Sequence, residues 1–338
     1  MAVLPVTRPT LLDLSKRTDP DGSIAQIVEM LQQENLILQD MVFQEGNLPT
    51  GHRTTLRTGI PTPTWRKING GVQPTKSTTA QITFGTGMLE AYAEVDKALA
   101  DLNGNTASWR MSEEFGHIEG MNQTMARTIL YGNEGTQPEA FTGLTPYYNA
   151  RTTSASGANI ISANDATTPT DNQSIWLVGW GENTIHGIIP KGSNAGLQIT
   201  DKGQVTIENA DGAGGRMEGY RTHYRWDAGL AVRDWRYAVR ICNISKALLT
   251  VDAATGPNLP NLMFQALEQI QSLSGVRPVF YMSRGLITKL RQQSAAAVKT
   301  STLVIENVGG VMVQSFNGVP IKRVDALAAD EAYVPASS

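Results

Sequence analysis

The sequence predicts an α+β fold of about two domain-sized units, and three observations lead to this prediction. The chain has 338 residues, 41% of them hydrophobic, so it can bury a sizeable core and is not a disordered chain. Apolar residues recur at helical spacing in some segments and alternate in others. Only 17% of residues are charged, while 32 are glycine; this composition is typical of turn-rich, strand-rich proteins and of surfaces that become covered.

Composition excludes several classes of protein. The 28 basic and 31 acidic residues give a net charge of −3, which provides no strong overall attraction for nucleic acid or acidic lipid. Residues 1–9 lack the basic start and apolar core of a signal peptide, and no apolar run approaches the roughly 20 residues of a membrane span. The single cysteine cannot form an internal disulfide. We therefore expect an intracellular product without membrane contact.

Residues 1–45 are predicted to form an N-terminal arm. Prolines at positions 5, 9 and 20 favour an extended chain that cannot pack alone. A helix is expected over residues 23–40, because Ser23 and Gln26 form a capping box beside an apolar stripe. An ordinary surface helix is one interpretation, but the extended stretch before it favours an arm that docks onto another subunit.

Residues 46–84 are predicted to form a long two-stranded hairpin. Its flanks alternate and are rich in threonine, and residues 69–71 (NGG) mark a tight turn. No acidic residue occurs from position 46 to position 89. The basic residues of this segment are Arg53, Arg57, Arg66, Lys67 and Lys76.

Such a hairpin has little to bury within its own domain. Isolated hairpins are marginal in water, so we expect this one to lie on an acidic neighbour. Nucleic acid is the competing target, but only Trp65 is available for stacking, whereas single-strand binders usually show several aromatic side chains.

Two helices are expected next. Residues 88–102 place apolar side chains on one helical face and end at Asn103 and Gly104, a favourable helix end. Residues 108–131 carry a stripe that includes Met111 and Phe115, which we interpret as core packing.

The rest of the chain is predicted to mix strands and helices. Residues 220–244 alternate aromatic and apolar residues with arginines, which indicates strands, although basic and aromatic interleaving is also a nucleic-acid-binding pattern. Other strands are expected at residues 174–180, 184–189, 279–282, 303–305, 311–313 and 319–321. Helices are expected at residues 260–273 and 283–298.

The residue patterns of common catalytic sites are missing. The four histidines lack the i, i+4 pairing of a helical metal site. Glu113 and Glu114 precede His117 at helical spacing, which favours a helical salt bridge, and Cys242 sits in an apolar strand as an inert core thiol would. Nucleotide-binding glycine loops and a serine elbow are absent. We predict no enzyme activity, no cofactor and no metal.

Five short motifs, in order along the chain, resemble one protein family. They are ILYGN at 129–133, PEAFTGL at 138–144, PKGSNAGL at 190–197, GLAVRD at 229–234 and NGVPIKRVDAL at 317–327. They are similar to passages of the major capsid proteins of tailed bacteriophages, and in particular of short-tailed enterobacterial phages. Each motif is short, but their order and spacing are specific, and the resemblance covers most of the chain from about position 46.

The resemblance implies the Hong Kong ninety-seven-type capsid fold. The implied parts are an N-terminal arm (1–45), an extended loop (46–84), a peripheral domain with a long spine helix (85–135, with C-terminal strands within 300–338) and an axial domain (136–299, with a strand-rich insertion at 175–244). The implied function is structural: self-assembly into the icosahedral head shell that encloses the double-stranded DNA genome.

The resemblance also implies partners and a location. The partners would be other copies in hexamers and pentamers, a scaffolding protein, a portal protein at one vertex and packaged DNA held without sequence specificity. The protein would assemble in the bacterial host cytoplasm and end in the virion.

Two departures from the family shape these expectations. Many members carry a long, cleaved scaffolding region before the loop, whereas residues 1–45 precede it here, so we expect a separate scaffolding protein and no proteolytic maturation. Lysines at 67 and 76 and asparagines at 307 and 317 supply the residue types of inter-subunit crosslinks but do not match the crosslinking pattern. We expect non-covalent locking, which an external decoration or clamp protein would support.

Candidate contact residues follow from the basic hairpin. In the extended loop they are Arg53, Arg57, Trp65, Arg66, Lys67 and Lys76. Their candidate acidic partners on a neighbour's spine helix are Glu113, Glu114 and Glu119. The alternative function is a nucleic-acid-binding protein that uses the basic hairpin at 46–84 and the arginine-rich strand at 220–244.

Overall fold

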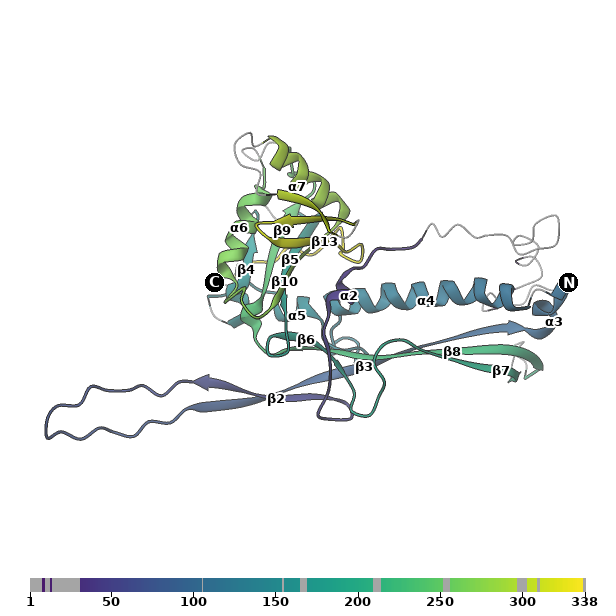
Figure 1. The fold of residues 1–338 in the computed structure, drawn as a ribbon, viewed down its shortest axis with the longest axis horizontal. Coiled ribbons are helices and arrows are strands. Elements are labelled where there is room, and N and C mark those ends of the chain that lie inside the picture. Colours follow the sequence, from purple (N-terminus) through teal and green to yellow (C-terminus); the bar gives the residue numbers. More distant parts are fainter. Residues whose placement is uncertain are drawn as a thin grey trace.

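A compact unit with two long projections makes up the protein (Figure 1). The computed structural model describes residues 8–9, 13, 31–104, 106–153, 155–164, 169–208, 214–251, 256–296, 303–308 and 311–336. One projection is a hairpin of β2 (Gly51–Gly59) and the first part of β3 (Thr78–Asp96). In the other, α4 (Thr106–Tyr131) lies along the rest of β3 and along β8 (Arg216–Val232).

The compact unit is built on a mixed sheet flanked by helices. Its central strands are β5 (Asn172–Trp180), β9 (Ala238–Ser245), β10 (Arg277–Met282) and β13 (Val319–Arg323), and its helices are α6 (Leu259–Gln269) and α7 (Arg284–Ala296). β5 runs antiparallel to both β9 and β10, and β10 runs parallel to β13. Every residue of β5 and β9 is buried. Their polar members are hydrogen-bonded inside the unit, as burial requires: Arg240 donates to Glu331, and Asn243 Nδ2 donates to Val334 O at 3.0 Å.

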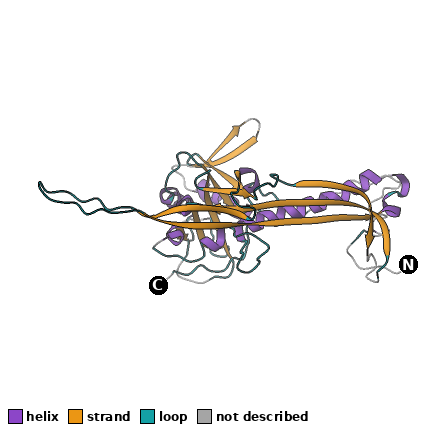
Figure 2. Cartoon of the chain, turned by 90° about the horizontal axis from the view of Figure 1, so that it is seen from below, coloured by secondary structure: helices purple, strands orange, loops and turns teal. Residues whose placement is uncertain are grey.

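One path of hydrogen-bonded strands connects the compact unit to both projections. The order along it is β11-β12-β13-β10-β5-β6-β8-β3-β2. The remaining strands are β1 (Phe43–Glu45), β4 (Ile160–Ser162), β6 (Ile185–Ile189), β7 (Gln198–Glu208), β11 (Leu303–Val308) and β12 (Val311–Phe316). The short helices are α2 (Ile37–Asp40), α3 (Lys97–Ala100) and α5 (Leu144–Tyr147), with single turns at Leu102–Gly104, Ala155–Asn159 and Trp235–Tyr237. Figure 2 shows the long strands running side by side from the hairpin into the opposite projection.

The C-terminal segment closes the compact unit with a buried polar cluster. Glu331 accepts a charged hydrogen bond from Arg240 Nη2 at 2.8 Å, and both side chains are almost fully buried. Tyr131 Oη, at the end of α4, donates to Glu331 at 2.5 Å, and Ser174 of β5 also donates to this carboxylate. Because a buried carboxylate is stable only when paired and hydrogen-bonded, the cluster ties the C-terminal segment, α4 and the sheet together.

The helix predicted over residues 88–102 is wrong, because most of this segment is strand. Residues Thr86 to Asp96 pair antiparallel with Gly229 to Gly219 of β8. On the side facing α4, Ala93 and Val95 are buried two positions apart, as a strand requires. Short apolar windows fit both periods, and the available partner strand decides between them.

The helix predicted over residues 23–40 is also mostly wrong where it can be compared. Residues 23–30 lie outside the described part of the chain. Residues 31–36 are not helical, since Asn35 forms a bridge with Val324 and Leu36 N donates to Arg323 O at 3.4 Å. Pairing with the C-terminal segment replaces the helical hydrogen bonds, and only α2 remains helical.

The other expected helices and strands are present, with shifted ends. The hairpin, the long helix α4, α6, α7 and the three C-terminal strands all occur. The stripe on α4 is core only in its second half: Met121 and Met125 are buried, whereas Met111 is 71% and Phe115 42% exposed. The interpretation of the whole stripe as packing is therefore wrong for its first half.

Two pairings differ from the expected grouping of elements into domains. β13, expected with the peripheral domain, pairs with β10 inside the compact unit. β7 and β8, expected in the axial insertion, form a sheet with β3 alongside α4. The pairing of Thr86 with Gly229 joins segments that are far apart in the sequence, and such a pairing is not visible in the sequence alone. The division into domains stays a prediction.

Candidate assembly interface

The hairpin is a regular two-stranded ladder at its base and an open loop at its tip. Gly51 to Arg57 of β2 pair with Gly85 to Thr79 of β3 without interruption, and a bulge follows at Gly59. Beyond the ladder, Gly70 N donates to Lys67 O at 3.0 Å, and Asn69 has a positive φ of 65°. Asparagine tolerates this conformation better than most residues, so the predicted tight turn is present.

The base of the hairpin is held by backbone and amide hydrogen bonds. The Asn47 side chain donates from Nδ2 to Arg53 O and accepts at Oδ1 from Arg53 N, both at 2.7 Å. Gly46 N donates to Ile189 O at 2.7 Å, which joins the base to β6. Phe84 is buried at the same place. These contacts set the direction in which the hairpin leaves the compact unit.

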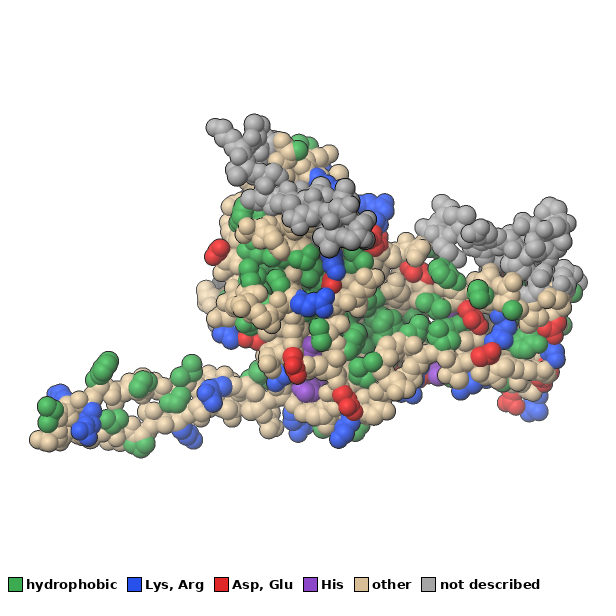
Figure 3. Space-filling view, viewed as in Figure 1, with side chains coloured by type: hydrophobic (Ala, Val, Ile, Leu, Met, Phe, Trp, Pro, Cys, Tyr) green, Lys and Arg blue, Asp and Glu red, His purple; other side chains and the backbone are tan. Residues whose placement is uncertain are grey.

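The tip carries large apolar side chains that its own subunit does not cover. Trp65 is fully exposed, Ile68 is 92% exposed and Ile60 is 85% exposed. Figure 3 shows hydrophobic side chains standing out along the thin hairpin. Large exposed apolar groups clustered on one element mark a contact surface.

The predicted basic residues point into solvent together with the apolar ones. Arg57, Arg66, Lys67 and Lys76 are exposed, and no ion pair to any of them occurs among the described residues. Arg53 is exposed too, and its Nε donates to Thr83 Oγ1 at 3.1 Å. The hairpin therefore presents uncompensated positive charge beside apolar surface.

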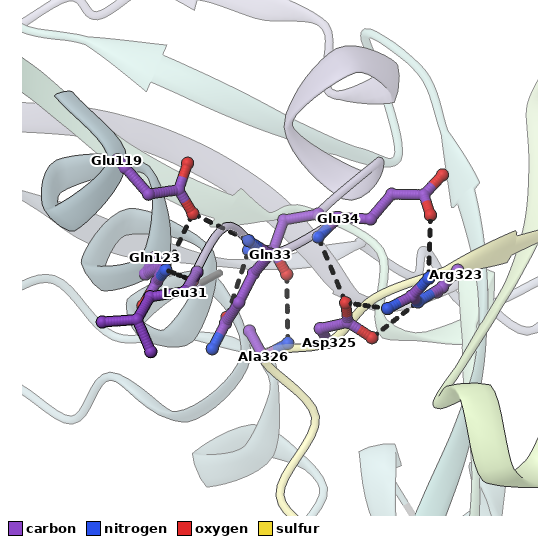
Figure 4. A network of polar contacts seen from close by, with 9 residues as sticks. Leu31, Gln33, Glu34, Glu119, Gln123, Arg323, Asp325 and Ala326 are labelled. Carbon is purple, nitrogen blue, oxygen red and sulfur yellow. Dashed lines mark hydrogen bonds and ion pairs between the residues drawn. The ribbon is translucent and has the colours of Figure 1, made fainter. Parts of the chain in front are cut away.

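The three predicted acidic partners on α4 are half-buried and engaged within their own subunit. Glu114 accepts from Thr222 Oγ1 at 2.7 Å. Glu119 accepts from the backbone N of Gln33 at 2.9 Å and from Gln123 Nε2 at 2.7 Å (Figure 4). Glu113 lines a hollow of about 600 Å³. The predicted pairing of these residues with the loop is untested and stays a prediction.

That hollow lies between β3, α4 and the beginning of the chain. Arg8 Nη2 and Arg221 Nη2 flank the Glu94 carboxylate at 2.7 and 2.6 Å. Burial acts to raise the pKa of Glu94, but hydrogen bonds from Arg8 and Arg221 outweigh it and hold the pKa below its usual value. This carboxylate is charged and already compensated, which makes it a poor partner for a further cation.

The arginine-rich strand is largely neutralised within the subunit. Four arginine–carboxylate pairs account for this: Arg221–Glu94 (2.6 Å), Arg225–Asp227 (2.7 Å), Arg236–Asp234 (2.6 Å) and Arg240–Glu331 (2.8 Å). A nucleic-acid-binding surface needs cations free to contact phosphate. The interleaved arginines are therefore explained by strand packing.

A buried histidine lies where the hairpin joins the compact unit. His186 of β6 is fully buried, and neither ring nitrogen has a hydrogen-bond partner among the described residues. Its ring meets that of His52 of β2 edge to face, with centroids 5.9 Å apart. Burial, with smaller contributions from Arg233 and His52, lowers the pKa of His186 to about 4. The site holds an uncharged imidazole near neutral pH.

Within the described ranges, no group of three or more His, Cys, Asp or Glu residues could hold a metal ion. Across those same ranges, no helix is both long and apolar enough to cross a membrane. Cys242 is buried in β9, as predicted.

The structure reveals exposed residues that the sequence reasoning did not select. Ile60 and Ile68 share the tip with Trp65, and Glu134 and Glu139 are exposed near the end of α4. The sequence did carry a signal for the two isoleucines. They lie in a segment without acidic residues and with several prolines, where an apolar side chain has no core to join. No sequence signal distinguished the two glutamates.

Comparisons with known proteins give a consistent result. The family model "Major capsid protein GP7" matches residues 19–335. A chain from the cryo-EM structure of bacteriophage Epsilon15 is 38% identical, with a TM-score of 0.79 and 99% of each chain covered. A chain of the bacteriophage JBD30 capsid is 9% identical, with a TM-score of 0.47 and coverage of 88% of this chain and 92% of that one. No curated protein matches.

The match to the family model spans nearly the whole chain, and the likeness to the Epsilon15 chain covers both the compact unit and the projections. Exposed apolar and basic side chains on a rigid hairpin fit a protein whose surface is completed by other copies. The mixed architecture is the Hong Kong ninety-seven-type capsid fold that the motifs implied, and the protein is a structural component of a phage virion. The chain belongs to the GP7 family of major capsid proteins, which build the icosahedral shell of the phage head.

Proposed function

We propose that the hairpin at 46–84 is the element that locks neighbouring subunits into hexamers and pentamers of the shell. The observation that carries this proposal is the exposure of Trp65 and Ile68 beside the cations Arg66 and Lys67, which have no ion pair within the described part of the chain. Apolar surface gains about 25 cal/mol per Å² when it leaves water. A hairpin tip whose apolar side chains stay exposed on its own subunit gains this stabilisation on a neighbour.

Many weak contacts suffice for a stable shell. Each copy both donates a hairpin and receives one, so every contact is repeated around closed symmetric rings. Binding at one contact raises the effective concentration at the next, and the contacts reinforce one another. This supports a shell held without covalent bonds between lysines and asparagines, to which an external decoration or clamp protein could add contacts.

Further partners follow from the shell's geometry. Subunits with exposed apolar tips can associate at several curvatures, so a separate scaffolding protein would select one. A closed shell needs an entry for the genome, which a portal protein at one vertex would provide. Packaged DNA would be contacted without sequence specificity, because the arginines at 221, 225, 236 and 240 are paired internally. Assembly would take place in the host cytoplasm.

Charge reversal tests the locking role. The variant with Arg57→Glu and Arg66→Glu is expected to remain a folded, soluble subunit by circular dichroism and to form no particles by negative-stain microscopy. The unmodified chain, expressed with its scaffolding protein, should form uniform shells. Normal particles from the charge-reversed chain would contradict the proposal. A matched control is Lys202→Glu, an exposed cation on β7 far from the hairpin.

The alternative function as a nucleic-acid-binding protein has one remaining support, the unpaired cations of the hairpin. Binding of the soluble subunit to DNA that weakens steeply with salt would favour it. We expect weak binding that the charge-reversed chain shares, since arginine pairing neutralises the strand at 220–244.

A further inference from the structure

A small apolar groove opens between β3 and α4, at the waist of the molecule. Its volume is about 110 Å³. The residues that form its apolar lining are Met88, Leu89, Met125, Ala140 and Phe141. Met88 is 67% exposed at its edge. In Figure 3 a band of hydrophobic side chains is visible between α4 and β3 on this face.

The wall of the groove is rigid because glycines allow close backbone packing. A Cβ atom on Gly87 would lie 2.9 Å from Glu139 O, so the segment around Glu139 rests directly on β3. The turn after α4 is closed by hydrogen bonds from Gly143 N to Gly132 O (2.9 Å) and from Gly132 N to Thr128 O (2.8 Å). The groove is thus preformed, and a partner would not have to order it.

Two acidic side chains border this apolar groove. Glu139 lines it directly, and the Glu134 carboxylate lies 3.0 Å from the position of a Cβ on Gly85, two residues before Gly87 in β3. Both glutamates are exposed, and neither has an ion pair with any other described residue. The groove therefore combines apolar surface with uncompensated negative charge.

The hairpin tip has the complementary character. Trp65 and Ile68 supply exposed apolar groups, and Arg66 and Lys67 between them supply positive charge. The tip cannot reach the groove of its own subunit, because the rigid β2–β3 ladder carries it away from α4 (Figure 1). The occupant must come from a second copy of this chain.

A neighbouring hollow shows that the match is selective. A second hollow, of about 350 Å³, also borders Met88, but Lys191 lines it, and the acidic residue that lines it, Asp227, is already paired with Arg225 at 2.7 Å. Positive charge there would repel the basic tip, since like charges across an interface oppose association. The hollow beside Glu94 already holds Arg8 and Arg221.

We propose that the hairpin tip of one subunit, residues 65–68, docks in the groove between β3 and α4 of another subunit, with Ile68 toward Met88 and the cations Arg66 and Lys67 beside Glu134 and Glu139. This inference rests on the locking role of the hairpin and names its receiving surface. It assigns the acidic partner to the turn after α4 rather than to Glu113, Glu114 and Glu119.

Disulfide trapping in assembled particles tests the contact. The only native cysteine, Cys242, is buried, so introduced cysteines report without background. Ile68→Cys combined with Met88→Cys should give a ladder of covalent multimers on a non-reducing gel after mild oxidation. The matched control is Ile68→Cys combined with Met111→Cys, since Met111 is an equally exposed methionine beside Glu113 and Glu114 on α4. Each cysteine alone should give no ladder.

The outcomes separate this inference from the locking role. Particles that form but give no Met88 ladder, or that give a Met111 ladder instead, would overturn the groove assignment and leave the locking role standing. Failure of the unmodified chain to form particles would overturn both. A Met88 ladder from particles alone, absent from dilute subunits, supports the assignment.

A charge exchange provides a second measurement that does not depend on cysteine geometry. Glu134→Lys with Glu139→Lys should abolish particles, as should Arg66→Glu with Lys67→Glu. The chain that carries all four changes should recover particle formation, because opposite charges again face each other. If the chain with all four changes forms no particles, just as the chain with only the two glutamate changes forms none, the contact is contradicted.

Discussion

The same kind of side chain, a tryptophan, is buried in the compact unit and exposed at the hairpin tip. Trp176, in β5, is fully buried, with Tyr148 packed against it edge to face at 5.6 Å. Trp65, at the tip, is fully exposed. The unit completes its core within one chain, whereas the tip leaves apolar surface that the described part of its own chain does not cover. On the proposed locking role of the hairpin, the difference teaches that folding and assembly are assigned to separate regions of one sequence.

The largest expected effect on the free energy of unfolding comes from the two tryptophans compared directly. Trp176→Ala should destabilise the subunit by about 3–5 kcal/mol, because it removes buried apolar contacts and leaves a cavity. Trp65→Ala should change the stability by less than about 0.5 kcal/mol while reducing particle yield. Urea unfolding of the soluble subunit followed by circular dichroism measures both. Equal effects of the two substitutions on the free energy of unfolding would contradict the distinction between the compact unit and the hairpin tip.

The buried polar cluster around Glu331 should have the next largest effect on the free energy of unfolding. Glu331→Ala leaves Arg240 buried without its partner and is expected to cost about 3 kcal/mol. Asp330→Ala, at the adjacent exposed position, is the control and should be nearly neutral. Urea unfolding again gives the values. An unchanged free energy of unfolding in Glu331→Ala would show that water reaches Arg240 and that this polar cluster does not hold the compact unit closed.

The histidine at the base of the hairpin should make stability depend on pH. The pKa of His186 is about 4 in the folded protein against 6.5 for an unperturbed histidine, so protonation favours the unfolded state. Its contribution is fully present above pH 6.5 and is lost as the pH falls toward 4, by about 3 kcal/mol. His186→Phe should flatten this part of the pH profile relative to the unmodified chain. An unchanged profile would mean that the site admits water.

The smallest effect on stability is expected at the base of the hairpin, where it joins the compact unit. Asn47→Ala removes the two amide hydrogen bonds to the backbone of Arg53 and should weaken the local structure by about 1 kcal/mol. Hydrogen exchange at the Arg53 amide should become faster while the core amides of β5 stay unchanged. Thr55→Ala, an exposed change on the same strand, serves as the control. Faster exchange of the amide hydrogens throughout β5 would show that the base of the hairpin and the core unfold as a single cooperative unit.

Sequence reasoning located the hairpin and the long helix because strong local signals mark both. Alternation around residues 69–71 and the absence of acidic residues marked the hairpin, and a periodic stripe marked α4. It failed over residues 88–102, where a short apolar segment fits either period and β8 supplies a partner. It also assigned Met111 and Phe115 to the core, because periodicity shows which face is apolar but not how far the covering layer extends.

The amino-acid sequence by itself determined the α+β class, the family resemblance and the unusual basic, acid-free hairpin, since all of these are local in the chain. Only the tertiary structure decided which charges are already used. Glu114 and Glu119 meet partners within their own subunit, whereas Glu134 and Glu139, beside an apolar groove, have no ion pair with any residue that the structure describes. The physical reason is that a charge becomes available or compensated through groups brought near it in space, and those groups are distant in sequence.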